Sequence, residues 1–198
     1  MLELDEAALN PDPIEQFRRW YQAALDASVP LPSAMALATT SASGEPSVRM
    51  VLLASVDQAG FVFQTHLDSP KARDLRARPR AALAFWWPAL QRQVRVSGPV
   101  SPLSDSEASA YFEAEPPAIQ AMIRACPQGA VIPDRSALEA LYAAEVAGGG
   151  GGRPSHWGGY RVGVDWIEFW QGRPNRLQDR LRYTRTPAGD WRIERLVP

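Results

Sequence analysis

MALATTSASGEPSVRMVLLASVDQAGFVFQT, residues 35–65, is the stretch that decides the fold. It contains runs rich in Val, Leu, Phe and Thr at residues 35–39, 48–56 and 61–65, separated by the turn sequences SASGEP and DQAG. Short β-forming runs broken by Gly and Asp turns are typical of antiparallel hairpins. The stretch therefore predicts an antiparallel β-meander.

The remainder of the chain adds further strands to this meander. Strand-like runs recur at residues 81–87, 92–100, 159–172, 179–185 and 190–198. Because they follow one another with short connections and no regular alternation with helices, they favour an antiparallel arrangement. We expect a mainly β fold, an antiparallel β-barrel with helices on its outside, built as a single domain over residues 1–198.

Helix signals occur before, within and after the strands. Residues 12–27 predict an amphipathic helix, in which Asp12 is a suitable N-cap and Pro13 fits the first turn. A short helix is expected to begin after Ser69, which is placed to cap it. Helix signals return over about residues 104–146, and the glycines within about residues 147–154 predict a flexible loop.

Composition limits the classes of partner. The formal net charge of −1 over 198 residues gives no reason to expect nucleic acid as a partner. The single Cys126 has no partner for an internal disulfide, which fits a reducing compartment. The acidic start MLELDEAALNPDP lacks the features of a signal peptide, and no run of about 18 apolar residues predicts a membrane span. We expect a cytoplasmic protein without a nucleic-acid or membrane partner.

The sequence carries little catalytic machinery of its own. With two histidines and one cysteine, a zinc site of the usual ligand spacing is not expected, and no other metal site is predicted. The chain also lacks the GxSxG, GxxxxGK[ST] and GxGxxG motifs. If the protein is an enzyme, a bound cofactor is expected to carry the chemistry.

Scattered residues point to a phosphate site. Arg49 opens the run RMVLL, Thr65 ends the next run, and Ser69 and Lys71 stand at the start of a helix, where free N–H groups and the helix dipole favour an anion. Lys71 is the only lysine among 21 Lys and Arg residues. Each residue alone is as readily a strand-edge Arg, a helix cap or a solvated Lys. Together, two cations and two hydroxyls near one helix start predict a phosphate cradle.

Ordered segments along nearly the whole chain resemble the pyridoxamine 5'-phosphate oxidase family. They are DPIEQFRRW, AMALAT, RMVLL, QTHLDSPKA, RQVRVSG, SHWGGYRV, IEFWQG and RLQDRLRYTR. The resemblance implies an FMN-binding split β-barrel that works as a homodimer, with the FMN sites at the subunit interface. It also implies an oxidase of vitamin B6 metabolism, in which a small-molecule substrate gives hydride to flavin N5 and oxygen is reduced to hydrogen peroxide.

The resemblance assigns roles residue by residue. The FMN-binding positions are Arg49, Met50, Val51, Leu52, Leu53, Gln64, Thr65, Lys71, Gln93, Gln128, Trp170 and Arg180. Arg49 and Lys71 match residues near the FMN phosphate, and Gln128 is expected to arrive from the second subunit. Tyr111, Arg176 and Gln178 match substrate-binding positions, with Arg176 as the catalytic residue that orients the substrate over the flavin.

The substrate side departs from the family pattern. Where the family holds the substrate phosphate with a Lys, an Arg and a Ser, this chain has Ala54, Glu115 and Ile119. Losing two cationic contacts of about 1.5–3 kcal/mol each would lower affinity for a phosphate by roughly 10²–10⁴. A phosphorylated substrate is therefore expected to bind weakly, unless Arg124 or Arg173 replaces the missing cations.

Three functions stay open on this basis. The first is a pyridoxamine/pyridoxine 5'-phosphate oxidase with a rearranged phosphate site. The second is a paralogous flavin oxidase of an unphosphorylated aromatic ring, resembling the phenazine-biosynthesis branch. The third is a non-catalytic flavin-binding protein.

Overall fold

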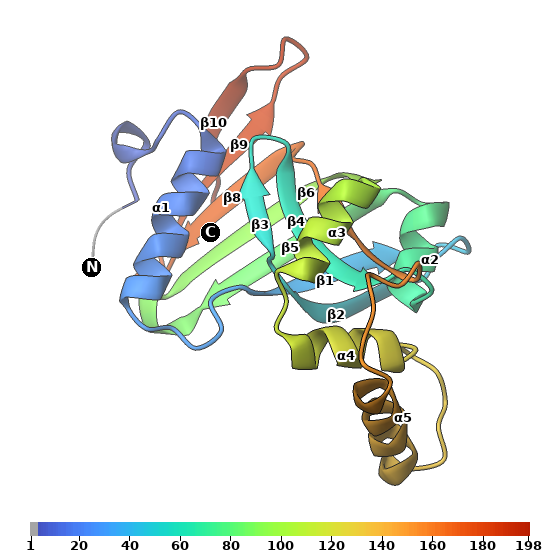
Figure 1. Cartoon of the computed structure of the whole chain (residues 1–198). Helices are drawn as coiled ribbons and strands as arrows, with labels where there is room; N and C mark the ends of the chain where they lie inside the picture. The colour runs from blue at the N-terminus through green and yellow to red at the C-terminus, as the bar shows by residue number, and fades with distance from the viewer. Residues whose placement is uncertain (1–3) are drawn as a thin grey trace.

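A curved antiparallel sheet forms the centre of the computed structural model, which describes residues 4–198 (Figure 1). The sheet has ten strands in this described part of the chain, and all their pairings are antiparallel. They are β1 (Ala34–Thr40), β2 (Pro46–Leu52), β3 (Ser55–Asp57), β4 (Gly60–His66), β5 (Arg80–Trp87), β6 (Arg92–Pro102), β7 (Trp157–Val162), β8 (Trp166–Gln171), β9 (Asp179–Arg185) and β10 (Trp191–Arg195). Residues 1–3 of the expected domain, the start of its acidic stretch, lie outside the described residues.

The sheet curls because β6 belongs to two of its parts. Seven strands run in the order β10-β9-β8-β6-β5-β1-β2, and β7, which pairs with β4, joins the far end of β6 through Val100 and Val162. A side chain at Gly98 would overlap the carbonyl oxygen of Gly163, so this close approach of two backbones requires glycine. The prediction of a mainly β, antiparallel split barrel with flanking helices is confirmed.

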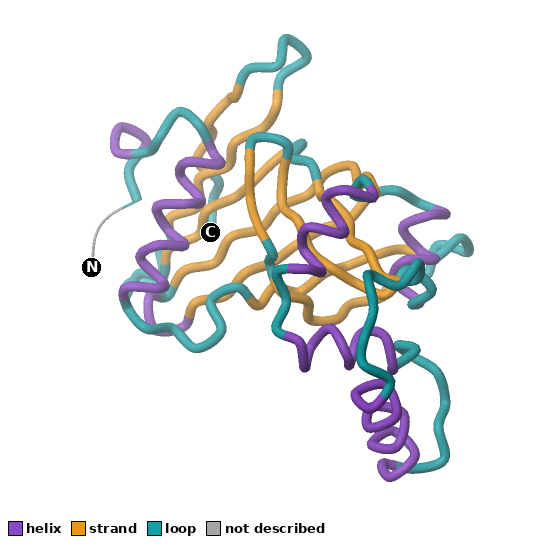
Figure 2. The backbone as a smooth tube through the Cα atoms, viewed as in Figure 1, coloured by secondary structure: helices purple, strands orange, loops and turns teal. Residues whose placement is uncertain are grey.

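Helices flank the sheet (Figure 2). They are η1 (Glu6–Ala8), α1 (Pro13–Asp26), α2 (Pro70–Ala77), η2 (Pro88–Leu90), α3 (Asp105–Glu113), α4 (Pro117–Ala125) and α5 (Arg135–Ala147). α1 begins as predicted, because the Asp12 carboxylate accepts hydrogen bonds from the first amides of the helix. Its Phe17 ring lies 4.7 Å from that of Phe61, so α1 covers the core side of the sheet.

Two expected strands are interrupted, and both breaks have a backbone cause. The run 48–56 divides into β2 and β3, because the N–H of Leu53 bonds to Ser33 whereas that of Ala54 bonds to Val62. The chain thus leaves β1 and joins β4 at Ala54. The run 159–172 likewise divides into β7 and β8.

The helix signals over about residues 104–146 correspond to three helices, α3, α4 and α5. Ser104 and Asp134 cap α3 and α5 with their side chains, whereas Pro116 occupies the N-cap of α4 and offers no side-chain cap. α4 and α5 extend away from the sheet (Figure 1), and the glycines 148–152 follow α5 in an irregular stretch. Within the described residues, no helix combines the length and apolar character needed to cross a membrane.

Candidate functional site

The sequence-predicted cofactor residues meet around one cavity. Its volume is about 840 Å³, within the usual range for a ligand site. Its lining includes Arg49, Met50, Val51, Leu52, Leu53, Ala54, Gln64, Thr65, Pro70, Lys71, Glu115, Ile119, Met122, Ile123, Gln128 and Trp157. The cavity therefore joins the edge strand β2, the end of β4, the start of α2 and the helix α4.

Lys71 marks one end of this cavity, which we call the Lys71 end and which also holds Arg49, Thr65 and Gln128. The Lys71 side chain is buried, and its Nζ donates hydrogen bonds of 3.0 Å to Thr65 Oγ1 and to Gln128 Oε1. Within residues 4–198 no carboxylate pairs with it. Burial, together with the nearby positive charge of Arg49, lowers the pKa of Lys71. A bound anion would relieve this unfavourable placement of the ammonium.

Arg49 is braced against the neighbouring strand. Its Nη1 donates to Thr39 Oγ1 at 2.6 Å and to the carbonyl of Leu37 at 3.2 Å. Asp74 of α2 lies 3.7 Å from Nη2. Burial lowers the pKa of Arg49, and Asp74 opposes that shift. With two cations and this one carboxylate, the Lys71 end keeps a positive surplus.

Ser69 does not cap α2, contrary to the prediction. It occupies the N-cap position, but its hydroxyl accepts no bond from the helix. The hydroxyl is buried and finds no hydrogen-bond partner in the described part of the chain. An orphaned hydroxyl, free first-turn amides and the Lys71 ammonium are groups that a phosphate satisfies together. The Lys71 end therefore fits the phosphate of FMN.

Gln128 was expected to come from a second subunit, but it contacts Lys71 of its own chain. Its amide oxygen accepts from Lys71 of the same chain and lies 3.4 Å from Thr65 Oγ1. Gln128 lies in the connection between α4 and α5, and its neighbour Gly129 faces Pro70 at the start of α2.

Gln93, Trp170 and Arg180 lie elsewhere, outside the cavity lining. They occupy one row across β6, β8 and β9, because Gln93 pairs with Trp170 and Trp170 with Arg180. The Trp170 ring packs edge-on against Trp86 at 5.9 Å, and Arg180 Nε donates to Glu168 Oε1 at 2.9 Å. In one chain, β5 and β1 lie between this row and β2, the strand that carries Arg49 of the Lys71 end.

This row shares a face of the sheet with exposed apolar side chains of β2 and β5, and we call it the open face. Cross-strand partners lie on the same side of a sheet. Such pairs connect Met50 on β2, through β1 and β5, to Arg95 on β6, so both side chains lie on one face. Val48, Met50, Leu52 and Trp86 are exposed by 69%, 63%, 56% and 51%. An exposed apolar patch of this kind marks a protein interface.

A second part of the cavity lining holds the three departures from the family pattern, which are Ala54, Glu115 and Ile119. We call it the Glu115 end. Gln64 Nε2 donates to Glu115 Oε1 at 3.1 Å, and Trp157 Nε1 donates to Gln64 Oε1 at 3.2 Å. Sequence reasoning missed this network, because no local pattern joins residues so far apart in the chain.

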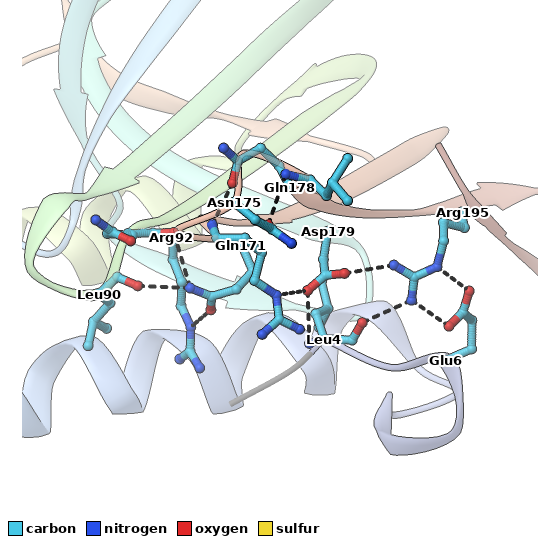
Figure 3. A network of polar contacts seen from close by, with 12 residues as sticks. Leu4, Glu6, Leu90, Arg92, Gln171, Asn175, Gln178, Asp179 and Arg195 are labelled. Atoms are coloured by element: carbon cyan, nitrogen blue, oxygen red, sulfur yellow. Dashed lines mark hydrogen bonds and ion pairs between the residues drawn. The ribbon is translucent and has the colours of Figure 1, made fainter. Parts of the chain in front are cut away.

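The predicted substrate residues are not brought together in a single chain. Tyr111 on α3 shares a hydrogen bond with Ser55 Oγ and stands one helical turn before Glu115, beside the cavity but outside its lining. Arg176 lies in the loop after β8, with a left-handed φ of 61°. Gln178 uses its amide oxygen to accept from the backbone of Arg173 (Figure 3). Gln178 thus shapes the loop that carries Arg176.

The two arginines suggested as replacement phosphate ligands are already engaged. Arg124 pairs with Glu145 and donates to the carbonyl of Gly151 at 2.9 Å. Arg173 pairs with Asp179 at 2.6 Å, and Asp179 also accepts from Arg195 in the network of Figure 3. Each would have to break an ion pair to reach a substrate. Among the described residues, no group of three or more His, Cys, Asp or Glu side chains could hold a metal ion.

Family models match most of the chain. The model described as pyridoxamine 5'-phosphate oxidase matches residues 21–144. The model described as the pyridoxine 5'-phosphate oxidase C-terminal dimerisation region matches residues 157–198. It covers β7 to β10, including Trp170, Arg176 and Arg180.

Named relatives and solved structures agree with these matches. The chain is 50% identical to the pyridoxine/pyridoxamine 5'-phosphate oxidase of Burkholderia ambifaria, over 98% of this chain and 93% of that protein. It is 48% identical to pyridoxine/pyridoxamine 5'-phosphate oxidase 1 of Ralstonia nicotianae, with the same coverage. PhzG from Burkholderia lata, solved with tetrahydrophenazine-1-carboxylic acid, superposes with a TM-score of 0.95 at 34% identity, covering 100% of this chain and 98% of that one.

Proposed function

Because the chain belongs to the pyridoxamine 5'-phosphate oxidase family, we propose that it is an FMN-dependent oxidoreductase. The observation that carries the proposal is the Lys71 end of the cavity. It combines a buried ammonium without a carboxylate partner in residues 4–198 with the braced guanidinium of Arg49, and it lies at the start of α2, where the buried hydroxyl of Ser69 has no partner among the described residues. Charge-assisted contacts to phosphate contribute about 1.5–3 kcal/mol each, so such a set would hold FMN tightly.

The chain's own residues would divide the work along the cavity. Arg49, Thr65 and Lys71 would hold the FMN phosphate, and the backbone of residues 50–53 would run beside the flavin. When bound, FMN supplies an N5 that accepts hydride and a reduced ring that oxygen reoxidises, giving hydrogen peroxide. Arg176 would orient the substrate, and Gln178 would fix the loop that holds Arg176.

We propose that the protein is a homodimer whose FMN sites lie between subunits. The open face supports this, because it carries both the exposed apolar residues of β2 and the row of Gln93, Trp170 and Arg180. A two-fold arrangement would place this row of one protomer against the cavity of its partner. Residues 157–198 also match a family dimerisation region.

The substrate is proposed to be a ring compound oxidised at a CH–NH2 or CH–OH carbon. A phosphorylated B6 vitamer is the family default, and the relatives named as pyridoxine/pyridoxamine 5'-phosphate oxidases favour it. A second candidate is an unphosphorylated aromatic ring, favoured by Ala54, Glu115 and Ile119 in the cavity and by the likeness to PhzG. Ala54 and Ile119 make the pocket wider and more apolar than the family pattern would, and such a pocket suits a flat ring.

One experiment tests the proposal and separates it from a non-catalytic flavin protein. Protein purified or reconstituted with FMN is expected to be yellow, to sediment as a dimer and to release peroxide when given pyridoxine, pyridoxamine or their 5'-phosphates. Protein that stays colourless after reconstitution contradicts the proposal as a whole. Yellow protein that a reductant bleaches, but that gives no peroxide with any amine or alcohol, points to a flavin carrier.

A further inference from the structure

Two parts of the cavity lining carry opposite charge. Lys71 and Arg49 give one end its positive surplus, whereas Glu115 stands at the other. The Oε1 atom of Glu115 accepts from Gln64 at 3.1 Å. Within residues 4–198, its Oε2 atom has no hydrogen bond and the carboxylate takes part in no ion pair. The Glu115 end therefore holds a negative charge that the described chain does not neutralise.

The surroundings of this carboxylate strengthen its effect on a ligand. Ile119, Met122 and Ile123 of α4 line the same part of the cavity, and Glu115 itself is half-buried. Next to apolar side chains a charge is screened less than in open water, so it attracts a cation and repels an anion more strongly. The nearby cation of α4, Arg124, is held by Glu145 and Gly151. A positively charged group of a ligand would therefore meet little competition from Arg124 for the Glu115 carboxylate.

The carboxylate is also held in position. Trp157 Nε1 donates to Gln64 Oε1, and the Gln64 amide donates in turn to Glu115. This chain of hydrogen bonds leaves Oε2 as the acceptor for a ligand.

We propose that Glu115 is a specificity-determining residue that binds a cationic group of the substrate. The cavity would then take an unphosphorylated aromatic amine and reject the corresponding phosphate ester. This inference rests on the proposed function, in which the FMN phosphate occupies the Lys71 end and the substrate lies toward Glu115.

The test compares three probes that share one ring. Pyridoxamine carries an ammonium group, pyridoxine has a neutral hydroxyl in its place, and pyridoxine 5'-phosphate adds an anion. Calorimetric titration of each, without oxygen, into reconstituted protein whose FMN has been reduced gives affinities without turnover. We expect wild-type protein to bind pyridoxamine about tenfold more tightly than pyridoxine, and the phosphate ester most weakly. The preference for the amine should shrink as salt rises to about 1 M, because salt screens the charge.

Two variants assign the preference to Glu115. Glu115→Gln keeps the shape but removes the charge, so the amine preference is expected to disappear. Glu113→Gln is the matched control, since Glu113 is exposed on α3 and does not line the cavity; it should retain the preference. Glu115→Arg is expected to reverse the order and favour the phosphate ester.

The proposal is overturned if Glu115→Gln keeps the full amine preference, or if wild-type protein binds the phosphate ester most tightly. The salt dependence of wild-type protein decides the matter should a variant fail to fold. Flavin absorbance of the same samples distinguishes a failure of the proposed function from a failure of the proposed role of Glu115. Colourless protein contradicts the proposed function, whereas yellow protein without charge selectivity contradicts only the role of Glu115.

Discussion

The two ends of the cavity are built from different kinds of structure. At the Lys71 end, Arg49, Thr65 and Lys71 come from β2, β4 and the start of α2, and hydrogen bonds tie them to the barrel, whereas Gln128 comes from the connection after α4. At the Glu115 end, much of the wall comes from α4, where Ile119 and Met122 are exposed by 39% and 41%. Residues on such an appendage can change without disturbing the core. Arg49, Thr65 and Lys71, which match the family pattern, lie at the Lys71 end, whereas the departures Ala54, Glu115 and Ile119 lie at the Glu115 end.

Rebuilding the Glu115 end should give the largest effect. We expect the double variant Ala54→Lys, Glu115→Arg to bind pyridoxine 5'-phosphate about 10²–10⁴ times more tightly, because it restores two cationic contacts. Titration calorimetry measures the gain. The double variant Glu113→Arg, Ala118→Lys adds the same charges outside the cavity lining and should gain little. An equal gain in both would show that overall charge, not the site, governs the affinity.

Removing the Lys71 cation should weaken FMN binding without lowering the stability of the FMN-free protein. Lys71→Met is expected to weaken FMN binding by up to about 10²-fold. The quenching of flavin fluorescence on binding measures this loss. The melting temperature of the FMN-free protein should not fall, since a buried charge without a carboxylate partner in the described chain is being removed. Arg73→Gln, an exposed change on the same helix, is the control. Unchanged FMN affinity in Lys71→Met would place the phosphate elsewhere.

A charge on the open face tests whether the Lys71 end is complete in one chain. Trp86→Glu is expected to weaken dimerisation by about 30-fold, the size of an interface hot spot, and to weaken FMN binding with it. Sedimentation and flavin titration measure the two losses. Val131→Glu, at a fully exposed position between α4 and α5, should change neither. A monomeric variant that keeps tight FMN binding would contradict the shared site.

The smallest expected effect concerns a stacked pair of histidines outside the cavity lining. The rings of His66, next to Thr65, and His156, next to Trp157, stack at 4.3 Å, and His156 Nε2 donates to the Ile123 carbonyl at 3.2 Å. Burial, His156 and Lys71 lower the pKa of His66, against the opposing charge of Asp68.

Stability should therefore depend on pH in a definite direction. Above about pH 6.5, the ordinary pKa of histidine, His66 is neutral in both the folded and the unfolded chain, so its titration does not change the free energy of unfolding. Below it, the unfolded chain takes up a proton that the folded chain resists, so the free energy of unfolding falls. Urea titrations between pH 8 and pH 5 measure the slope. His66→Asn should flatten it, and an unchanged slope would assign the pH dependence to other groups.

Much of the fold followed from local sequence signals. The turns SASGEP and DQAG predicted hairpins, and Asp12 with Pro13 predicted the start of α1. The breaks after β2 and β7 escaped prediction, because they arise where the chain exchanges one strand partner for another. The start of α4 gave no capping signal, because the proline at its N-cap has no side-chain oxygen that could accept a hydrogen bond from the helix.

The site was predictable only in part, for a similar reason. Arg49 and Lys71 lie in segments whose local pattern resembles a known family, and the structure brings them to one cavity. Contacts over long separations left no such signal. Gln64 meets Glu115 at a separation of 51 residues, and Trp157 meets Gln64 at a separation of 93. The same holds for Gln128, whose place beside Lys71 depends on the path of the chain after α4.

The burial of Lys71 has a practical consequence. Apart from the α-amino group, this chain offers an acylating reagent one amine, and that amine lies inside the cavity. A mass shift at that position would report whether the cavity is occupied, with little background from the surface. The rarity of lysine thus turns a single side chain into a built-in chemical reporter.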